Sequence, residues 1–133
     1  MTQASSIIAI VDDDTSVRRA LQRLVESAGY TVETFASARE FLEWLPQGQA
    51  ACLVLDVHMD GMSGFDLQQR LAVPVIFVTA HDDALTLDRI KRSRVAGHLR
   101  KPIDANEVLN AIRGAVDGRA QGLAGKPGNA EAS

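Results

Sequence analysis

Several residue types that characterise other classes of protein are scarce in this chain of 133 residues. It has one cysteine, Cys52, so no disulfide bond can form within the chain, and we expect this thiol to be buried. No apolar run approaches the roughly 18 residues of a membrane-spanning helix, and residues 1–6 lack the regions of a signal peptide. The net charge of −3 offers no basic surface to a nucleic acid. These absences favour a cytoplasmic protein without a membrane or nucleic-acid partner.

The apolar residues alternate between short runs and helical stripes along most of the chain. Five runs predict strands, at residues 7–11, 30–35, 51–55, 74–78 and 95–99. Apolar residues three and four positions apart predict a helix after the first run, capped by Asp14 and ended by Gly29. Ser37 and Glu40 form a capping box for the second helix, and Asp104 caps the last.

Two more helices are predicted between these elements, one at residues 65–71 and one capped by Asp82 or Asp83. Five strands that alternate with five helices predict a parallel sheet with helices on both faces. Right-handed crossovers leave few strand orders, of which the doubly wound order 2-1-3-4-5 is the natural one. The predicted fold class is therefore α/β, a doubly wound (βα)5 three-layer sandwich.

The length is that of one domain. We expect a flexible N-terminus at residues 1–5 and the folded domain at residues 6–117. Residues 118–133 are rich in Gly and Ala and have one large apolar side chain, so we expect a flexible tail or linker there. The sequence leaves open whether the chain is a single-domain protein or part of a longer one.

Four predicted strands end beside polar groups. Residues 12–14, all aspartates, follow the first strand, and Asp56 follows the third. Thr79 follows the fourth strand, and Lys101 comes shortly after the fifth. Crowded carboxylates at the carboxyl edge of a sheet repel one another unless a cation is present, and their hard oxygens prefer Mg²⁺. An aspartate can also act as a nucleophile toward a phosphoryl group, assisted by an ammonium and a hydroxyl. The pattern predicts Mg²⁺-dependent phosphoryl transfer.

Four short motifs carry these residues: Val11-Asp12-Asp13, LDVHMDGMSG at residues 55–64, Phe77-Val78-Thr79-Ala80, and Lys101-Pro102. Together they resemble the receiver domain of bacterial two-component response regulators, and the resemblance extends over residues 6–117. The segment VPVIFVTAHDD at residues 73–83 is similar to the nitrogen-fixation (FixJ-like) type of regulator.

The resemblance implies an aspartyl-phosphate site with Mg²⁺ as its cofactor. Asp56 would be the phosphoacceptor. The metal would be bound by Asp13, by Asp56 and by the backbone carbonyl of His58, with Asp12 in the near shell of the metal. Asp60 stands where the family usually has proline. Its carboxylate either points into solvent or alters the binding of donors and metal.

The resemblance also implies how the phosphoryl group is recognised. Lys101 would pair with the phosphoryl group or with Asp56, and Thr79 would donate a hydrogen bond to a phosphoryl oxygen and so sense it. His98 stands where the family has its switch aromatic. Because imidazole titrates near neutral pH, a pH-sensitive output is a hypothesis. The peptide bond before Pro102 would be cis.

The implied function is signalling and not the turnover of a metabolite, so we expect no enzyme beyond self-phosphorylation and self-dephosphorylation. A histidine kinase, a phosphotransfer protein or a small donor such as acetyl phosphate would supply the phosphoryl group. Phosphorylation would switch the face made by strand 95–99 and the helices on either side of it. An output partner or a second copy of the chain would bind that face. The basic segment 89–94 is either a solvated helix face or part of this surface. Any DNA-binding domain would belong to a longer parent protein.

Three other interpretations share parts of this pattern. Residues 12–15, DDDT, also resemble the nucleophile motif of haloacid-dehalogenase-like phosphatases, in which the first aspartate would carry the phosphoryl group. A zinc hydrolase would use the histidines His58, His81 and His98, but their spacing forms no zinc motif. A receiver that acts as an interaction module without phosphorylation would differ only in the chemistry of Asp56.

Overall fold

The computed structural model describes residues 7–45, 49–57, 71, 73–79, 84–92 and 95–125. Its elements follow in the order β1 (Ile7–Val11), α1 (Thr15–Ser27), β2 (Thr31–Phe35), α2 (Ala38–Trp44), β3 (Cys52–Asp56), β4 (Val75–Thr79), α4 (Ala84–Arg92), β5 (Gly97–Arg100) and α5 (Ala105–Gly125). Strands and helices alternate as predicted. The helix expected near residues 65–71 and the caps Asp82 and Asp83 lie outside the described residues, apart from residue 71.

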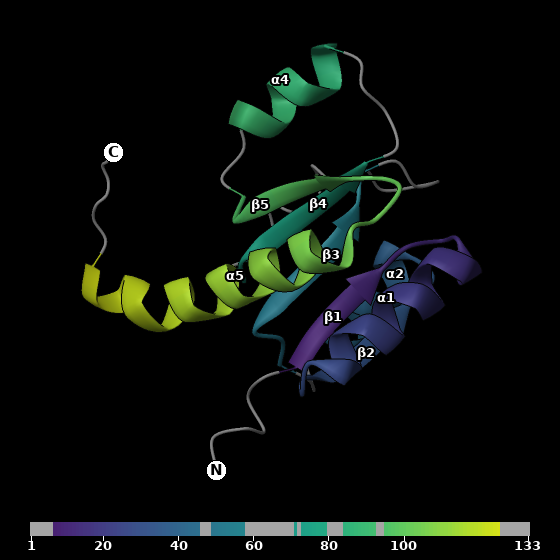
Figure 1. The fold of residues 1–133 in the computed structure, drawn as a ribbon, viewed down its shortest axis with the longest axis horizontal. Helices are drawn as coiled ribbons and strands as arrows, with labels where there is room; N and C mark the ends of the chain where they lie inside the picture. The colour runs from purple at the N-terminus through teal and green to yellow at the C-terminus, as the bar shows by residue number, and fades with distance from the viewer. Residues whose placement is uncertain are drawn as a thin grey trace.

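The five strands form one parallel sheet in the order β2-β1-β3-β4-β5, which confirms the predicted topology and fold class. Helices lie on both sides of this sheet (Figure 1). One apolar cluster packs α1 and α5 against one face and includes Leu21 and Ile112. A second cluster packs α2 and α4 against the opposite face and includes Phe41 and Ile90. The architecture is therefore a three-layer sandwich with a core on each side of the sheet.

The central strands β1, β3 and β4 are almost entirely apolar because successive side chains face the two helical layers in turn, whereas the edge strands β2 and β5 also carry exposed polar residues. In β1, Ile8 and Ile10 pack with α1 and α5, whereas Ala9 and Val11 pack with α2. Every residue of β3 and β4 is buried. A strand covered on both faces needs apolar side chains at consecutive positions, which explains the continuous runs in the sequence.

Strands β3, β4 and β5 each end one residue later than predicted, and in β3 and β4 the additional residue belongs to the polar site. In the parallel ladder, Asp56 pairs with Val78 and Thr79 pairs with Arg100. Asp56 and Thr79 are thus the last residues of β3 and β4, and the backbone pairing orients both. The backbone of a strand end is better ordered than that of a loop, so the sheet itself positions these side chains.

In the described part of the chain, the residues predicted to begin or end the helices have these roles. The carboxylate of Asp14 accepts hydrogen bonds from two backbone N–H groups in the first turn of α1. Gly29 has a φ of 100°, a left-handed conformation that favours glycine after a helix. Ser37 accepts from the backbone N–H of Glu40 at 3.1 Å, and Asp104 caps α5 through a 2.9 Å bond.

Helix α5 extends beyond its predicted end. We expected a flexible tail or linker from residue 118, but the helix continues to Gly125. Up to residue 117, where the structure describes the burial of side chains, Val108, Ile112 and Ala115 are buried. Beyond residue 117, Arg, Ala, Gln and Leu favour helix, and adding residues to an existing helix is far easier than starting one. No helix within the described ranges is long and apolar enough to cross a membrane.

Candidate functional site

Three polar side chains are buried at the carboxyl edge of the sheet. Asp12 follows β1 directly and is 1% exposed, Asp56 ends β3 and is 6% exposed, and Thr79 ends β4 and is fully buried. These are the buried polar residues of the described part of the chain. Strands β1 and β3 are the pair at which the strand order reverses, and ligands of doubly wound sheets bind at that point.

The carboxylates of Asp12, Asp13 and Asp56 form a compact acidic group. One oxygen from each lies within 4.8 Å of the other two. Asp12 and Asp56 are buried in this group and Asp13 is exposed. Asp14 serves a different purpose, because its Oδ1 accepts from the backbone N–H groups that begin α1, at 2.9 and 3.2 Å. The sequence suggested three or four carboxylates at this edge, and the structure groups three.

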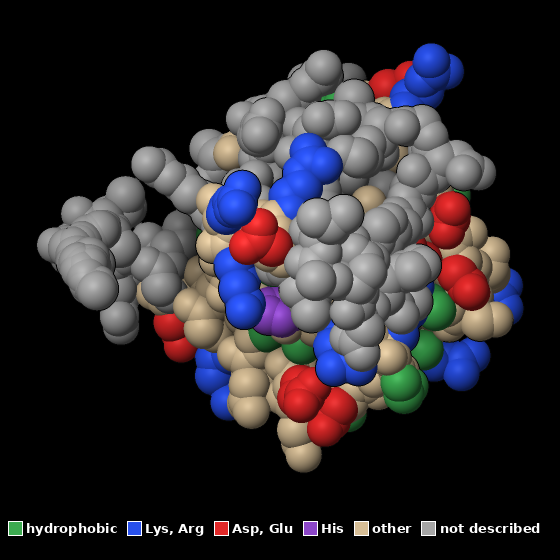
Figure 2. Space-filling model, turned by 90° about the horizontal axis from the view of Figure 1, so that it is seen from above, with side chains coloured by type: hydrophobic (Ala, Val, Ile, Leu, Met, Phe, Trp, Pro, Cys, Tyr) green, Lys and Arg blue, Asp and Glu red, His purple; other side chains and the backbone are tan. Residues whose placement is uncertain are grey.

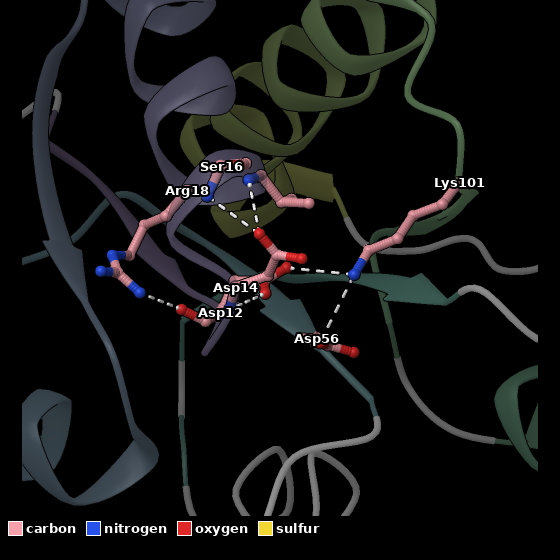
Figure 3. A network of polar contacts seen from close by, with 7 residues as sticks. Asp12, Asp14, Ser16, Arg18, Asp56 and Lys101 are labelled. Atoms are coloured by element: carbon pink, nitrogen blue, oxygen red, sulfur yellow. Dashed lines mark hydrogen bonds and ion pairs between the residues drawn. The ribbon is translucent and has the colours of Figure 1, made fainter.

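Lys101 supplies the positive charge of the site (Figure 3). Its Nζ lies 3.4 Å from Asp12 Oδ2 and 3.6 Å from Asp56 Oδ2. The backbone N–H of Lys101 donates to the carbonyl of Thr79 at 2.9 Å, so this residue is tied to the end of β4. The Lys101–Pro102 peptide bond is cis. The site thus groups three carboxylates with one ammonium, which forms ion pairs with two of them.

The donor set fits a hard divalent cation. Asp12 Oδ2 is buried and accepts no hydrogen bond within the described residues, although the Lys101 ammonium lies near it. A buried carboxylate oxygen without a hydrogen bond is costly, and a cation would satisfy it. Three carboxylates, one of them at the surface, match the way Mg²⁺ is bound through a few carboxylates while it keeps water ligands.

The turn that carries Asp12 is held at several points. Its N–H donates to the carbonyl of Phe35 in β2 at 3.2 Å, and its Oδ1 accepts from the N–H of Asp14 at 2.8 Å. Its carbonyl oxygen accepts a 2.7 Å hydrogen bond from Nη1 of Arg18 on α1. We did not predict this contact from the sequence. The available signal was an arginine in the second turn of the helix, because long side chains on a helix point back toward its N-terminus.

His98 lies on the edge strand β5, apart from the acidic group. Its side chain is exposed, and in the ladder it pairs with Phe77. An open groove between β5 and α5 is lined by residues of both elements, among them Gly97, His98 and Glu107. His58, Asp60 and His81 lie outside the described residues, so the roles considered for them stay predictions.

Basic side chains stand out on α4 and β5. Arg89, Lys91, Arg92 and Arg100 are exposed, and Arg92 pairs with Asp88 at 2.9 Å. Figure 2 shows Lys and Arg side chains beside the histidine on the face seen from above, with acidic side chains among them. The described part of segment 89–94 therefore belongs to a mixed, charged surface.

Cys52 takes no part in this chemistry. It is fully buried in β3, and burial raises the pKa of its thiol from an ordinary value of 9.0 to about 12, although a backbone hydrogen bond at Leu53 lowers it in part. A thiol with such a pKa is protonated at neutral pH and is a poor nucleophile. Cys52 is therefore a buried core thiol, as expected from the sequence.

Comparisons with known proteins agree with this geometry. Residues 8–113 match the family model of the response regulator receiver domain. The response regulator protein TodT of Pseudomonas putida is 38% identical over 121 residues, which cover 87% of this chain and 53% of TodT. The transcriptional regulatory protein FixJ of Bradyrhizobium diazoefficiens is 33% identical over 115 residues, which cover 82% of this chain and 56% of FixJ.

A solved structure of the response regulator StyR superimposes with a TM-score of 0.81 at 39% identity, covering 91% of this chain and 64% of that one. The chain spans about half the length of curated relatives such as TodT and FixJ. FixJ is among the relatives, as the predicted resemblance implied, although TodT shares more identity. The chain belongs to the response regulator receiver domain family and is a receiver of two-component signalling.

Proposed function

We propose that the chain accepts a phosphoryl group on Asp56 in the presence of Mg²⁺ and thereby signals to a partner. The observation that carries this proposal is the group of three carboxylates within 4.8 Å, two of which face one lysine ammonium. Asp13 and Asp56 would hold the metal directly, together with the backbone carbonyl of His58, and Asp12 would lie in its near shell. The bound cation would neutralise negative charge as an anionic donor approaches.

The contacts of Asp12 support a metal-binding role for that residue, and Asp56 is the proposed nucleophile. The backbone and Oδ1 of Asp12 are engaged in the turn before α1, which suits a residue that holds a metal. In the proposed step, an oxygen of Asp56 attacks phosphorus. The bond between phosphorus and the donor breaks, and the leaving group departs with the electron pair. With acetyl phosphate the leaving group is acetate.

Lys101 and Thr79 would recognise the phosphorylated product. The 3.6 Å separation between Lys101 Nζ and Asp56 Oδ2 is an ion pair without a short hydrogen bond, so the ammonium can turn to a phosphoryl oxygen. Thr79 ends the strand next to β3, and its hydroxyl would donate to a second phosphoryl oxygen. The backbone hydrogen bond from the N–H of Lys101 to the carbonyl of Thr79 connects the residue after β5 to the last residue of β4.

The signal would then leave through the α4-β5-α5 face. A shift of Thr79 toward the phosphoryl group would change the packing next to β5, and His98 would take the place of the family's switch aromatic. Two states of this face that differ in partner affinity would make phosphorylation a switch. The proposed partners are a histidine kinase or phosphotransfer protein as donor, and an output partner or second copy of the chain as reader.

The relatives suggest that such a reader can be part of the same protein. TodT is named a response regulator protein and FixJ a transcriptional regulatory protein, and both are about twice as long as the part matched here. We propose that a regulatory output of that kind belongs to a parent protein. On this proposal the chain turns over no free metabolite, and its chemistry is limited to its own phosphorylation and dephosphorylation.

Intact-mass spectrometry tests the proposal. The wild type and the variants Asp56→Asn, Asp12→Asn and Asp14→Asn are incubated with acetyl phosphate and Mg²⁺, or with a chelator. We expect the wild type and Asp14→Asn to gain the mass of one phosphoryl group, and Asp56→Asn or chelation to prevent it. Asp14→Asn is the matched control, because asparagine also caps helices well.

Each alternative outcome identifies a different function. An adduct that persists in Asp56→Asn and is lost in Asp12→Asn would contradict the proposal and favour the phosphatase chemistry. A wild type that binds Mg²⁺ but gains no phosphoryl group, either from acetyl phosphate or from a histidine kinase, would favour an interaction module that works without phosphorylation.

A further inference from the structure

We propose that Arg18 is a positioning residue of the metal site and holds the acidic turn in the geometry that binds Mg²⁺. This inference rests on the proposed function, because it assumes that the carboxylates of Asp12, Asp13 and Asp56 receive a cation. Arg18 is no metal ligand in this proposal, and it acts only through the backbone of Asp12.

The guanidinium of Arg18 donates hydrogen bonds to two acceptors near the start of α1, and Figure 3 shows the bond to Asp12. Its Nη1 donates to the carbonyl oxygen of Asp12 at 2.7 Å, and its Nη2 donates to Oγ1 of Thr15 at 3.3 Å. The first bond is short, charge-assisted and partly buried, which are the features of a strong hydrogen bond. The second bond keeps the planar group from rotating away. Arg18 thus connects the body of α1 to the end of β1.

The carbonyl of Asp12 is the important atom, because it belongs to the rigid peptide unit between Asp12 and Asp13. A peptide unit is planar, so holding its oxygen also sets the direction in which both aspartates leave the backbone. Asp13 depends on this most. It is exposed, and within the described residues its side chain accepts no hydrogen bond that would orient it. The backbone that Arg18 holds therefore sets where the side chain of Asp13 begins and which positions its carboxylate can reach.

The charge of Arg18 makes this role testable. Within the described residues Arg18 forms no ion pair with an aspartate, so it leaves the carboxylate oxygens available to a cation. As a nearby positive charge it opposes a cation. Removing Arg18 therefore has two effects of opposite sign. Loss of positioning weakens Mg²⁺ binding, whereas loss of charge strengthens it, and the measured direction shows which effect dominates.

Calorimetric titration with Mg²⁺ tests the proposal on the whole chain. The variants are Arg18→Met, Arg18→Lys and the control Arg19→Met, which removes an exposed charge from the next position of the same helix. We expect Arg18→Met to weaken Mg²⁺ affinity about tenfold, the scale seen when groups that orient metal ligands are lost. Arg18→Lys should recover part of the loss, because its ammonium can donate to the same carbonyl. Arg19→Met should bind Mg²⁺ as the wild type does.

A second measurement separates positioning from stability. Urea unfolding in a chelator shows whether each variant folds, and the dependence of acetyl phosphate labelling on Mg²⁺ concentration shows how the site responds. We expect Arg18→Met to need more Mg²⁺ for half-maximal labelling but to reach nearly the wild-type rate at saturation. If Arg18→Met does not fold, Arg18→Lys alone decides, with an expected affinity below that of the wild type.

An Arg18→Met chain that folds and binds Mg²⁺ as tightly as the wild type, or more tightly, would overturn the inference but leave the proposed function standing. A wild type that binds no Mg²⁺ would overturn both. The two failures are therefore distinguishable in one set of titrations.

Discussion

At the scale of single residues, neighbouring aspartates of one acidic run have different tasks. The side chain of Asp14 is occupied by the first turn of α1. Asp12 uses one carboxylate oxygen to stabilise the turn and keeps the other buried beside Lys101. Asp13 is exposed and is grouped with the buried pair. Sequence position alone does not distinguish these tasks, because the three residues are chemically identical.

Asp13→Asn is expected to abolish the stabilisation of the fold by Mg²⁺. The substitution removes one carboxylate and leaves the hydrogen bonds of the turn unchanged. The wild type should gain about 2.7 kcal/mol of unfolding free energy when Mg²⁺ is present at about 100 times its dissociation constant. The variant should show little gain. Urea unfolding with Mg²⁺ and with a chelator measures the difference, and an equal gain in both proteins would remove Asp13 from the site.

Cys52 is expected to make stability depend on pH under alkaline conditions. Its folded pKa is raised to about 12, so the unfolded chain loses the thiol proton above pH 9 while the folded chain keeps it. The thiol's contribution to stability is complete below pH 9 and is lost as pH rises toward 12. From about pH 8 to about pH 10, the wild type should lose about 1.4 kcal/mol more than Cys52→Ala. Urea unfolding of both proteins tests this, and parallel losses would contradict it.

At the scale of elements, the cap of α1 and the paired ends of β3 and β4 fix the backbone of the site residues. The cap of α1 begins directly after the acidic group, so the helix and the turn share the backbone of residues 12–16. Strand ends act in the same way, since β3 and β4 present Asp56 and Thr79 from paired backbone. Capping and pairing therefore order the site before any ligand binds.

Asp14→Ala is expected to destabilise the fold by about 1 kcal/mol, because alanine cannot accept the two hydrogen bonds of the N-cap. Asp14→Asn keeps an acceptor and should cost much less. Mg²⁺ affinity should stay near the wild-type value in Asp14→Asn, since this carboxylate is not among the three that are grouped. Thermal unfolding and calorimetric titration check both points. A large loss of Mg²⁺ affinity in Asp14→Asn would show that the fourth carboxylate is a ligand.

At the scale of the whole molecule, one sheet separates two cores and carries the site at its edge. Each central strand, β1, β3 and β4, contributes side chains to both apolar clusters. One cluster packs with α1 and α5, and the other packs with α2 and α4. A displacement of the backbone at the end of β4 therefore changes the packing of side chains on both sides of the sheet. This arrangement suits a domain that converts a local charge change into a change of its surface.

A chain that ends at residue 117 is expected to keep its unfolding free energy within about 1 kcal/mol and to keep its affinity for Mg²⁺. The buried residues Val108, Ile112 and Ala115 precede this cut, and the family match ends at residue 113. A control chain that ends at residue 111 loses Ile112 and Ala115 and should unfold or lose several kcal/mol. Urea unfolding of both chains decides. A large loss in the longer one would show that the end of α5 stabilises the domain.

Local patterns were sufficient to predict most of the fold. The alternation of apolar runs and stripes predicted the strands within one or two residues, and the caps at Asp14, Ser37 and Asp104 agree with the structure. The end of α5 was missed because Gly118 and Gly122 resemble the start of a linker, whereas the surrounding residues continue the helix. Side-chain chemistry at the strand ends predicted the kind of site.

By itself, the sequence determined which elements form, their doubly wound order and which polar residues follow the strands, because periodicity, capping and connection rules act over short stretches of chain. Only the tertiary structure decided which carboxylates meet, how near Lys101 lies to each of two aspartates and that Arg18 holds the turn. These features depend on strand register and on the direction of side chains after packing. Residues far apart in the chain meet at the carboxyl edge only when the sheet has formed. A periodicity of two or 3.6 residues shows which side chains share a face of one element, but not how close residues of different elements lie.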